Sequence, residues 1–196
     1  LFEPDPVSGR TSLTADPTVA KRIGIKRRGS STLNDPKGSY RVEFWQDGTD
    51  EEEDVNLLGM SDHDEWVLYA PYTFDRALMR NAFLFETSNA AGTYAPRTRF
   101  VEVYLNTNGG SLETGDFQGV YVLMERISRN SQRVDVQKLN PWDNSEPRVS
   151  GGYMLSIDRL DPSDQGFRSA LNHPSDPPNA SPQPFFTYVY PKEQNI

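Results

Sequence analysis

The sequence contains no cysteine, and this absence removes several kinds of chemistry at once. Without thiols the chain can form no disulfide framework, no thiolate nucleophile and no cysteine-ligated metal site. Histidine is almost as scarce, because His63 and His173 are the only two and lie 110 positions apart. They lack the paired spacing of a zinc site, and the polar residues around each predict a surface position. A Ser-His-Asp hydrolase would need one of these histidines and is not favoured.

The chain also lacks the short motifs that mark common catalytic and nucleotide-binding loops. It has no G-x-S-x-G nucleophile elbow, no G-x-x-x-x-G-K-[ST] phosphate loop and no G-x-G-x-x-G fingerprint. No apolar run approaches the roughly 20 residues that cross a bilayer, so we expect no membrane insertion. Leu1 is not followed by a charged and apolar leader, and we interpret the chain as a soluble excised piece or a processed polypeptide.

Length and charge narrow the domain organisation and the partners. A chain of 196 residues and 22.2 kDa suits a single domain over residues 1–196 with one sizeable core. The net charge of −8 and the pI near 4.8 weigh against a nucleic-acid or anionic-membrane partner, since neither would be attracted by an acidic surface. The basic stretch Lys21–Arg28 is therefore a local exception.

Periodic segments predict an α+β fold with a mainly antiparallel sheet. Apolar residues at helical spacing between Phe74 and Ala90 predict one long helix, with Thr73 or Asp75 at its start and Gly92 after its end. An Asn-Gly-Gly turn signal joins two strand patterns into a hairpin. About seven strands are predicted, from the segments Ile23–Ile25, Tyr40–Phe44, Arg97–Leu105, Gln118–Ile127, Arg133–Leu139, Gly152–Ile157 and Phe185–Tyr190. The short apolar run Trp66–Tyr69 is either a further, buried strand or the approach to the helix.

Three segments predict loops rather than regular structure. Residues 1–17 form a lead-in loop rich in Pro, Asp, Ser and Thr, and residues 161–184 form a long surface loop with six prolines. Residues 47–54 (DGTDEEED) form an acidic loop. Calcium binding is conceivable there, but the loop lacks the ligand spacing of an EF-hand, and a solvated run of charge is the favoured interpretation.

The stretch from Ile25 to Phe44 is the strongest candidate for a binding site. It carries five basic side chains and a Gly-Ser-Ser-Thr turn between two strand patterns. Gly29 permits a sharp turn, whose backbone N–H groups and hydroxyls can face phosphate oxygens while nearby cations supply charge. An ordinary surface hairpin with solvated basic side chains is the alternative. The candidate residues are Arg28, Ser30, Ser31, Thr32, Lys37 and Arg41.

Other residues fit parts of the requirement for phosphoryl transfer, which needs cations, a carboxylate partner, metal-binding carboxylates and a catalytic Asp. Arg80 and Glu86 lie in the predicted helix, and Glu125 ends an apolar strand. The alternatives are that Arg80 and Glu86 are merely solvated and that Glu125 and Arg126 form an exposed ion pair worth little. Asp158 is either a metal ligand or a turn residue that ends a strand.

The order of several motifs is more specific than any one of them. They run from Ile23 to Lys192 as GIKRRGSST, PKGSYRVEF, LLGM, DEWVLYAPYTFDRALMRNAF, YAPRTRFVEVYLN, GVYVLMERI, RVDVQKL and GGYMLSIDR. With this series the chain resembles the CotH kinase family, atypical protein kinases of the spore-coat type. The resemblance implies a distant protein-kinase-like fold that binds ATP with Mg²⁺ or Mn²⁺ and phosphorylates Ser or Thr on secreted or surface proteins. A location outside the cytoplasm follows from the resemblance alone.

Fold analogy with kinases also implies residue roles. The hairpin from Arg28 to Arg41 would lie over the phosphates, the helix with Arg80 and Asn81 would be the positioning helix, and Leu123 to Glu125 would approach the adenine. The nucleotide-binding residues implied in this way are Arg28, Ser30, Ser31, Lys37, Arg41, Arg80 and Glu125.

The resemblance has one departure. In the family the catalytic Asp and a metal-binding Asp, in a W-D-x-D-like motif, follow the GGY strand and the YPK segment. Here YPKEQ lies just before Ile196, so we expect both residues after Ile196, the C-terminal catalytic part to be absent, and this piece alone to be inactive. The segment Pro141-Trp142-Asp143 precedes GGYML and is followed by Asn144, so no metal role is assigned to it.

Two other functions are compatible with the sequence. A non-catalytic secreted module that binds a partner protein or a cell-surface polysaccharide would suit the acidic charge, the long proline-rich loop and the aromatics Trp45 and Tyr72, which we expect to be exposed. A coat or matrix component would self-assemble without nucleotide. A downstream pair of Asp residues would favour the kinase over both.

Overall fold

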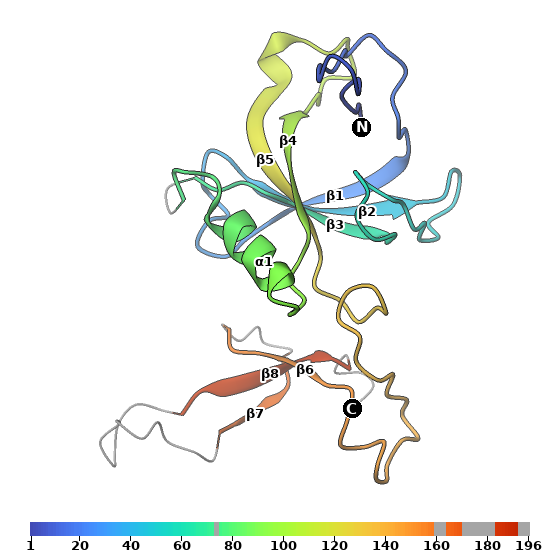
Figure 1. The fold of residues 1–196 in the computed structure, drawn as a ribbon, viewed down its shortest axis with the longest axis vertical. Coiled ribbons are helices and arrows are strands. Elements are labelled where there is room, and N and C mark those ends of the chain that lie inside the picture. Colours follow the sequence, from blue (N-terminus) through green and yellow to red (C-terminus); the bar gives the residue numbers. More distant parts are fainter. Residues whose placement is uncertain (73–74, 159–163, 170–182, 192–196) are drawn as a thin grey trace. The chain divides into compact units, whose positions relative to one another are not determined.

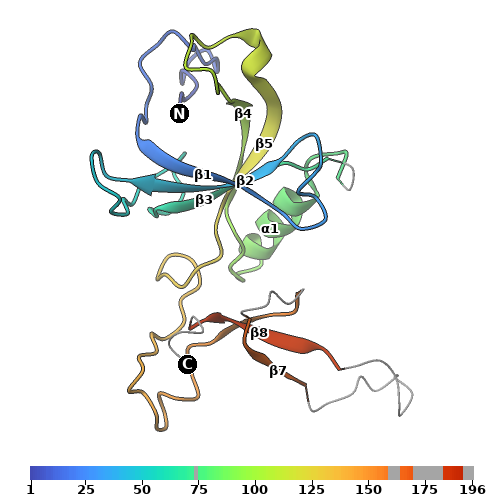
Figure 2. The same cartoon turned by 180° about the vertical axis from the view of Figure 1, so that it is seen from behind.

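The computed structural model describes residues 1–72, 75–158, 164–169 and 183–191. The chain divides into two compact units, Leu1–Ile127 and Ser128–Ile196. The first contains a five-stranded sheet and a helix, and the second a three-stranded sheet (Figures 1 and 2). That both units belong to one domain over residues 1–196 stays a prediction.

All five strands of the first sheet are antiparallel to their neighbours and follow the order β1-β2-β3-β5-β4. β4 and β5 form a long curved hairpin (Figure 1), and the short 3₁₀ helix η1 (Thr114–Asp116) precedes β5. The five strands confirm the sequence predictions for this unit and the α+β class. Their bounds are β1 Arg22–Arg28, β2 Ser39–Trp45, β3 Glu65–Tyr69, β4 Thr98–Tyr104 and β5 Phe117–Glu125.

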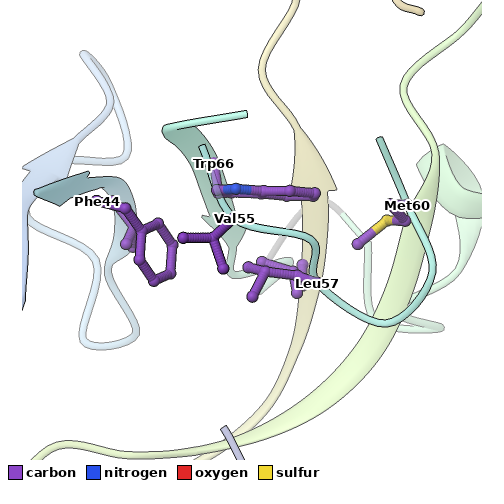
Figure 3. Close-up of a cluster of buried hydrophobic side chains, with 7 residues drawn as sticks. Phe44, Val55, Leu57, Met60 and Trp66 are labelled. Atoms are coloured by element: carbon purple, nitrogen blue, oxygen red, sulfur yellow. The ribbon is translucent and has the colours of Figure 1, made fainter. Parts of the chain in front are cut away.

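One face of this sheet carries the main core of the unit. Val42 faces Trp66 across β2 and β3, and the loop between these strands places further apolar residues against them. Trp66 is completely buried, and its ring nitrogen donates a hydrogen bond of 2.8 Å to the backbone oxygen of His63. The indole can therefore occupy the core without an unsatisfied donor. The buried cluster, part of which Figure 3 shows, consists of Val42, Phe44, Val55, Leu57, Met60, Trp66 and Leu123.

The helix α1 (Arg80–Ala90) begins later than the sequence pattern predicts. The backbone N–H of Arg80 donates a hydrogen bond of 2.9 Å to the buried carboxylate of Asp75, and Leu78 has a φ of 60°, which a right-handed helix does not allow. Residues 75–79 therefore form a turn before the helix, and the expected start at Phe74 is wrong. Thr73 and Phe74 lie outside the described residues. The predicted end is confirmed, because Gly92 follows the helix with a φ of 82°.

Most apolar side chains of α1 are not buried in the described part of the chain. Ala82 is the only buried residue of the helix, which lies against β4 (Figure 1). Helical spacing of apolar residues therefore predicted the helix without predicting which of them are covered. The exposed fractions are 63% for Phe83 and 62% for Leu84.

The second unit is built on three antiparallel strands in the order β6-β8-β7. β6 (Met154–Ser156) and β8 (Phe185–Tyr190) confirm two strand predictions. β7 (Gly166–Arg168) lies inside residues 161–184, so the interpretation of that whole range as loop is wrong at these positions. Residues 161–163 and 170–182 of the same range lie outside the described residues.

The strand predicted for Arg133–Leu139 is wrong. Only Val134 makes a strand-like contact, an isolated parallel bridge to Arg129. Within the described residues no neighbouring strand runs beside this segment, so its alternating pattern has no ladder to join. None of the helices in the described part of the chain combines the length and the hydropathy needed to cross a bilayer.

Candidate phosphate-binding site

The turn after β1 has the sharp geometry that the sequence predicts. Gly29 has a φ of 125°, and a Cβ at this position would lie 2.5 Å from the Thr32 hydroxyl oxygen. Only glycine fits such a turn without strain. The backbone N–H of Leu33 donates to the Ser30 carbonyl at 3.3 Å, and Ser31 is exposed. The Gly-Ser-Ser-Thr turn therefore lies at the surface, at the end of the β1–β2 hairpin.

Arg28 is the last residue of β1, immediately before this turn. Within the described residues it makes no hydrogen bond or ion pair, although partial burial and the charge of Arg126 lower the pKa of its guanidinium. Desolvation and a neighbouring like charge both disfavour the charged form of a base. Arg28 is thus a cation without a described carboxylate partner, so its guanidinium can donate charge-assisted hydrogen bonds to a phosphate.

Lys37 lies in a different environment. Its ammonium donates to the backbone oxygen of Val120 and lies 4.7 Å from the ring centroid of Tyr121. Burial lowers the pKa of this lysine. The Tyr121 hydroxyl is buried and has no hydrogen-bond partner among the described residues.

Arg41 lies on the opposite face of the sheet from Lys37 and Tyr121. Its neighbour Tyr40 packs near Tyr121 with a ring separation of 6.4 Å, and successive strand residues point to opposite faces. Arg41 contacts two carboxylates, Glu43 at 3.1 Å and Glu65. The basic residues that the sequence predicts to bind phosphate are therefore divided between the two faces of the sheet. Arg28 and Arg41 lie on one face and Lys37 lies on the other.

Arg80 and Glu86 both lie on α1. The Arg80 side chain is 72% exposed, and its Nε lies 3.8 Å from an oxygen of the buried Asp75. Glu86 is exposed. The structure therefore attaches Arg80 to the turn that precedes the helix.

Glu125 is wholly buried, which the sequence interpretation of an exposed pair with Arg126 did not foresee. Burial raises the pKa of this carboxyl, but hydrogen bonds from Ser61 and Arg97 and the charge of Arg97 lower it more, so the net shift is downward. The Ser61 hydroxyl donates at 2.7 Å, the Tyr94 hydroxyl at 3.2 Å and the Arg97 guanidinium at 2.9 Å. The interpretation as an exposed pair is wrong because Arg126 instead contacts Glu65.

These contacts tie two separate segments of the chain to the end of β5. The loop before β3 contributes Ser61, and the segment before β4 contributes Tyr94 and Arg97. The described contacts of Glu125 thus hold the sheet together, while its implied proximity to the adenine stays a prediction. A glutamate that ends an otherwise apolar strand was the only signal in the sequence, and its partners could not be deduced from spacing.

Two groups of side chains near the acidic loop could hold a metal ion. Asp54, His63 and Asp64 bring their ligand atoms within 4.8 Å of one another, and so do Glu43, Glu52 and Asp64. The surface position predicted for His63 is wrong, because its side chain is 13% exposed and its Nδ1 accepts the backbone N–H of Glu65 at 3.0 Å. His173 lies outside the described residues.

Trp45 is half-buried rather than exposed, because the guanidinium of Arg22 lies 4.9 Å from its ring centroid and covers it. Tyr72 is 43% exposed, as expected. Asp143 accepts hydrogen bonds from the backbone and side chain of Asn140, which suits a local turn.

The fold and these side chains define an α+β protein whose first sheet carries uncompensated arginine charge beside a tight glycine turn. The protein-family model for CotH kinase protein matches residues 25–183, which is most of the chain. The protein therefore belongs to the CotH kinase family, and this membership indicates a kinase-like function. No curated protein matches the sequence.

Proposed function

We propose that the protein is the nucleotide-binding portion of a CotH-type atypical kinase, which transfers the γ-phosphate of ATP to Ser or Thr of secreted or surface proteins. The family match supports a kinase-like function, and a distant protein-kinase-like fold is part of this proposal. ATP with Mg²⁺ or Mn²⁺ is the proposed cofactor, and the extracellular space or cell surface is the proposed location.

The observation that carries the proposal is the environment of Arg28. This cation has no described carboxylate partner, lies next to the turn at Gly29, and is adjacent to a second cation, Arg126. Charge-assisted hydrogen bonds to a phosphate would offset the cost of holding two cations together. Ser30 and Ser31 follow directly and would add hydroxyl and backbone donors.

The structure supports the other proposed nucleotide ligands to different degrees. Arg41 shares a face of the sheet with Arg28, although it is paired with Glu43 and Glu65. Lys37, Arg80 and Glu125 also have other contacts, to Val120, Asp75 and Arg97 respectively. Lys37 in particular lies across the sheet, so we expect Arg28 and Arg41 to contribute more to phosphate binding.

Calorimetry with ATP and Mg²⁺ tests the binding step in the natural full-length protein. Arg28→Ala should weaken ATP binding by about 1 to 3 kcal/mol, the value of a charge-assisted contact. Arg99→Ala is the control, because Arg99 is an exposed arginine of the same sheet whose side chain, among the described residues, donates only to the backbone oxygen of Thr98. Absence of any nucleotide binding at millimolar ATP would refute the proposal.

Transfer is measured separately, by incorporation of labelled γ-phosphate into a Ser- or Thr-containing protein. Phosphorylation that requires ATP and a divalent cation is expected. Binding of a polysaccharide or a partner protein with no nucleotide dependence would instead indicate a non-catalytic module.

A further inference from the structure

Several charged side chains lie on the face of the first sheet that carries Arg41. Lys26 faces Arg41 across β1 and β2, Arg41 faces Val67, and Val67 faces Met124. Residues two positions apart in a strand share a face, which adds Arg28 to this face. Arg126, the residue after β5, reaches the same face through its contact with Glu65. Glu43 and Glu65 are paired on this face as well. The basic cluster defined here consists of Lys26, Arg28, Arg41 and Arg126, with Glu43 and Glu65 among them.

Glu65 joins two members of the basic cluster. Its side chain is 10% exposed, and its two oxygens accept from different residues, Oε1 from Arg41 and Oε2 from Arg126. One nearly buried carboxylate therefore holds two guanidinium groups beside each other. Without such a bridge their mutual repulsion would turn the two side chains apart.

The basic cluster keeps an excess of positive charge. Four cations lie among two carboxylates, which leaves two positive charges within the basic cluster of a chain whose net charge is −8. Lys26 and Arg28 make no hydrogen bond or ion pair in the described part of the chain, and the Nε–H of Arg41 is buried without an acceptor. The cluster thus has unused donors and unbalanced charge, which an anion with several negative oxygens would satisfy.

We propose that the basic cluster binds the phosphate chain of the nucleotide, that Arg126 contacts it directly, and that Glu65 is a positioning residue for Arg41 and Arg126. This inference rests on the proposed function and adds to it two residues that sequence patterns did not indicate. The ligand class is a polyphosphate, either as part of ATP or as free inorganic triphosphate.

The decisive variant is Glu65→Gln, because two explanations predict opposite results. If the face attracts anions only through its net charge, loss of a negative charge should tighten binding. If Glu65 positions the arginines, binding of ATP and of inorganic triphosphate should weaken by about tenfold, the value of one charge-assisted contact. Glu102→Gln is the matched comparison, since this exposed residue of β4 lies on the same face by strand register but outside the basic cluster, and the variant should bind as tightly as wild type or slightly better.

A double-mutant cycle separates positioning from a general loss of structure. Arg126→Ala should weaken triphosphate binding by about 10- to 100-fold, and Glu65→Gln should have a smaller effect in that background than in the wild type, because only its contact with Arg41 is then left to lose. Unfolding transitions of all variants are recorded in parallel. If Glu65→Gln does not fold, Arg126→Lys gives the same test, with weaker binding expected because lysine lacks the planar fork.

The outcomes distinguish this inference from the proposed function. If the wild-type protein binds inorganic triphosphate as tightly as ATP, the basic cluster is supported as a polyphosphate site and the proposed kinase function is refuted. Wild-type binding of ATP that none of these variants changes would refute the basic cluster and leave the kinase. No binding of either ligand by the wild type would overturn both, and tighter binding by Glu65→Gln would overturn the positioning role.

Discussion

The carboxylate of Glu125 and the guanidinium of Arg97 form a salt bridge of 2.9 Å in which the acid is wholly buried while the base stays 36% exposed. The exposed side of the arginine keeps part of its hydration, so the pair avoids much of the desolvation cost of a fully buried ion pair. Hydrogen bonds from Ser61 and Tyr94 serve the remaining acceptor capacity of the carboxylate. The carboxylate of Glu125 therefore anchors the end of β5 to the loop before β3 and to the segment before β4.

Replacement of this buried acid should destabilise the first unit. We expect Glu125→Gln to lower the free energy of unfolding by about 1.5 to 3 kcal/mol, because hydrogen bonds to a charged group are lost and the amide has only one acceptor oxygen. Urea unfolding measures the change. Glu86→Gln, the same substitution at an exposed helix position, should stay within about 0.5 kcal/mol of wild type. Equal effects of the two substitutions would show that the network does not stabilise the fold.

The same carboxylate predicts a pH dependence. Its folded-state pKa lies below the ordinary value of 4.5, so its contribution to stability is fully present above pH 4.5 and is lost as pH falls through the folded-state pKa. The stability difference between wild type and Glu125→Gln should therefore shrink on acidification below 4.5 and stay constant above it. Urea midpoints of both proteins across this range provide the measurement, and a difference that grows on acidification would contradict the assignment.

Two tyrosines provide a matched test of buried hydroxyl groups. The Tyr121 hydroxyl is buried without a described partner, whereas the Tyr94 hydroxyl donates to Glu125. Tyr121→Phe should leave the unfolding free energy unchanged or raise it by up to about 1 kcal/mol, since an unsatisfied polar group is removed. Tyr94→Phe should lower it by about 1 kcal/mol. Thermal melts compare the two, and a clear loss of stability in Tyr121→Phe would indicate that its hydroxyl is hydrogen-bonded in solution.

Two adjacent glycines test the backbone of the second unit. Gly152 has a φ of 80°, and a Cβ there would lie 2.2 Å from the carbonyl oxygen of Gln137, whereas a Cβ at Gly151 would meet its nearest atom at an ordinary 3.6 Å. Gly152→Ala should therefore destabilise by about 1 to 3 kcal/mol or more, the cost of a strained backbone position. Gly151→Ala should be nearly neutral. Limited proteolysis within residues 128–158 reports the difference, and equal protection of the two variants would argue against the close contact.

The extent to which sequence predicted the fold differs between its elements. Local patterns predicted β2, because alternating apolar and polar residues mark a strand with one buried face. They also predicted the turn at Gly29, because glycine adopts backbone angles that other residues avoid. The start of α1 did not, since it depends on how the Asp75 carboxylate meets the backbone of Arg80. The segment Arg133–Leu139 has a strand-like pattern but no partner strand among the described residues, because pairing depends on the whole fold.

The candidate site shows the same division. Arg28 and the serine turn were predicted by a basic stretch beside glycine, and Arg41 by its strand position. The roles of Glu65 and Arg126 were not predicted, because these two residues are 61 positions apart in the sequence and meet only in the folded sheet. The separation of Lys37 from Arg41 onto different faces could be determined only once the register of the hairpin was known.

β1 is an edge strand of its sheet, and it is also the source of Lys26 and Arg28. Its exposed residues Ile23 and Ile25 would make this edge prone to pair with another chain, and the surrounding cations oppose such pairing through repulsion between copies. The charges of this strand therefore contribute to keeping molecules apart as well as to anion binding. A polyphosphate that neutralises them should reduce that repulsion, so the protein is expected to be less resistant to association when the basic cluster is occupied than when it is empty.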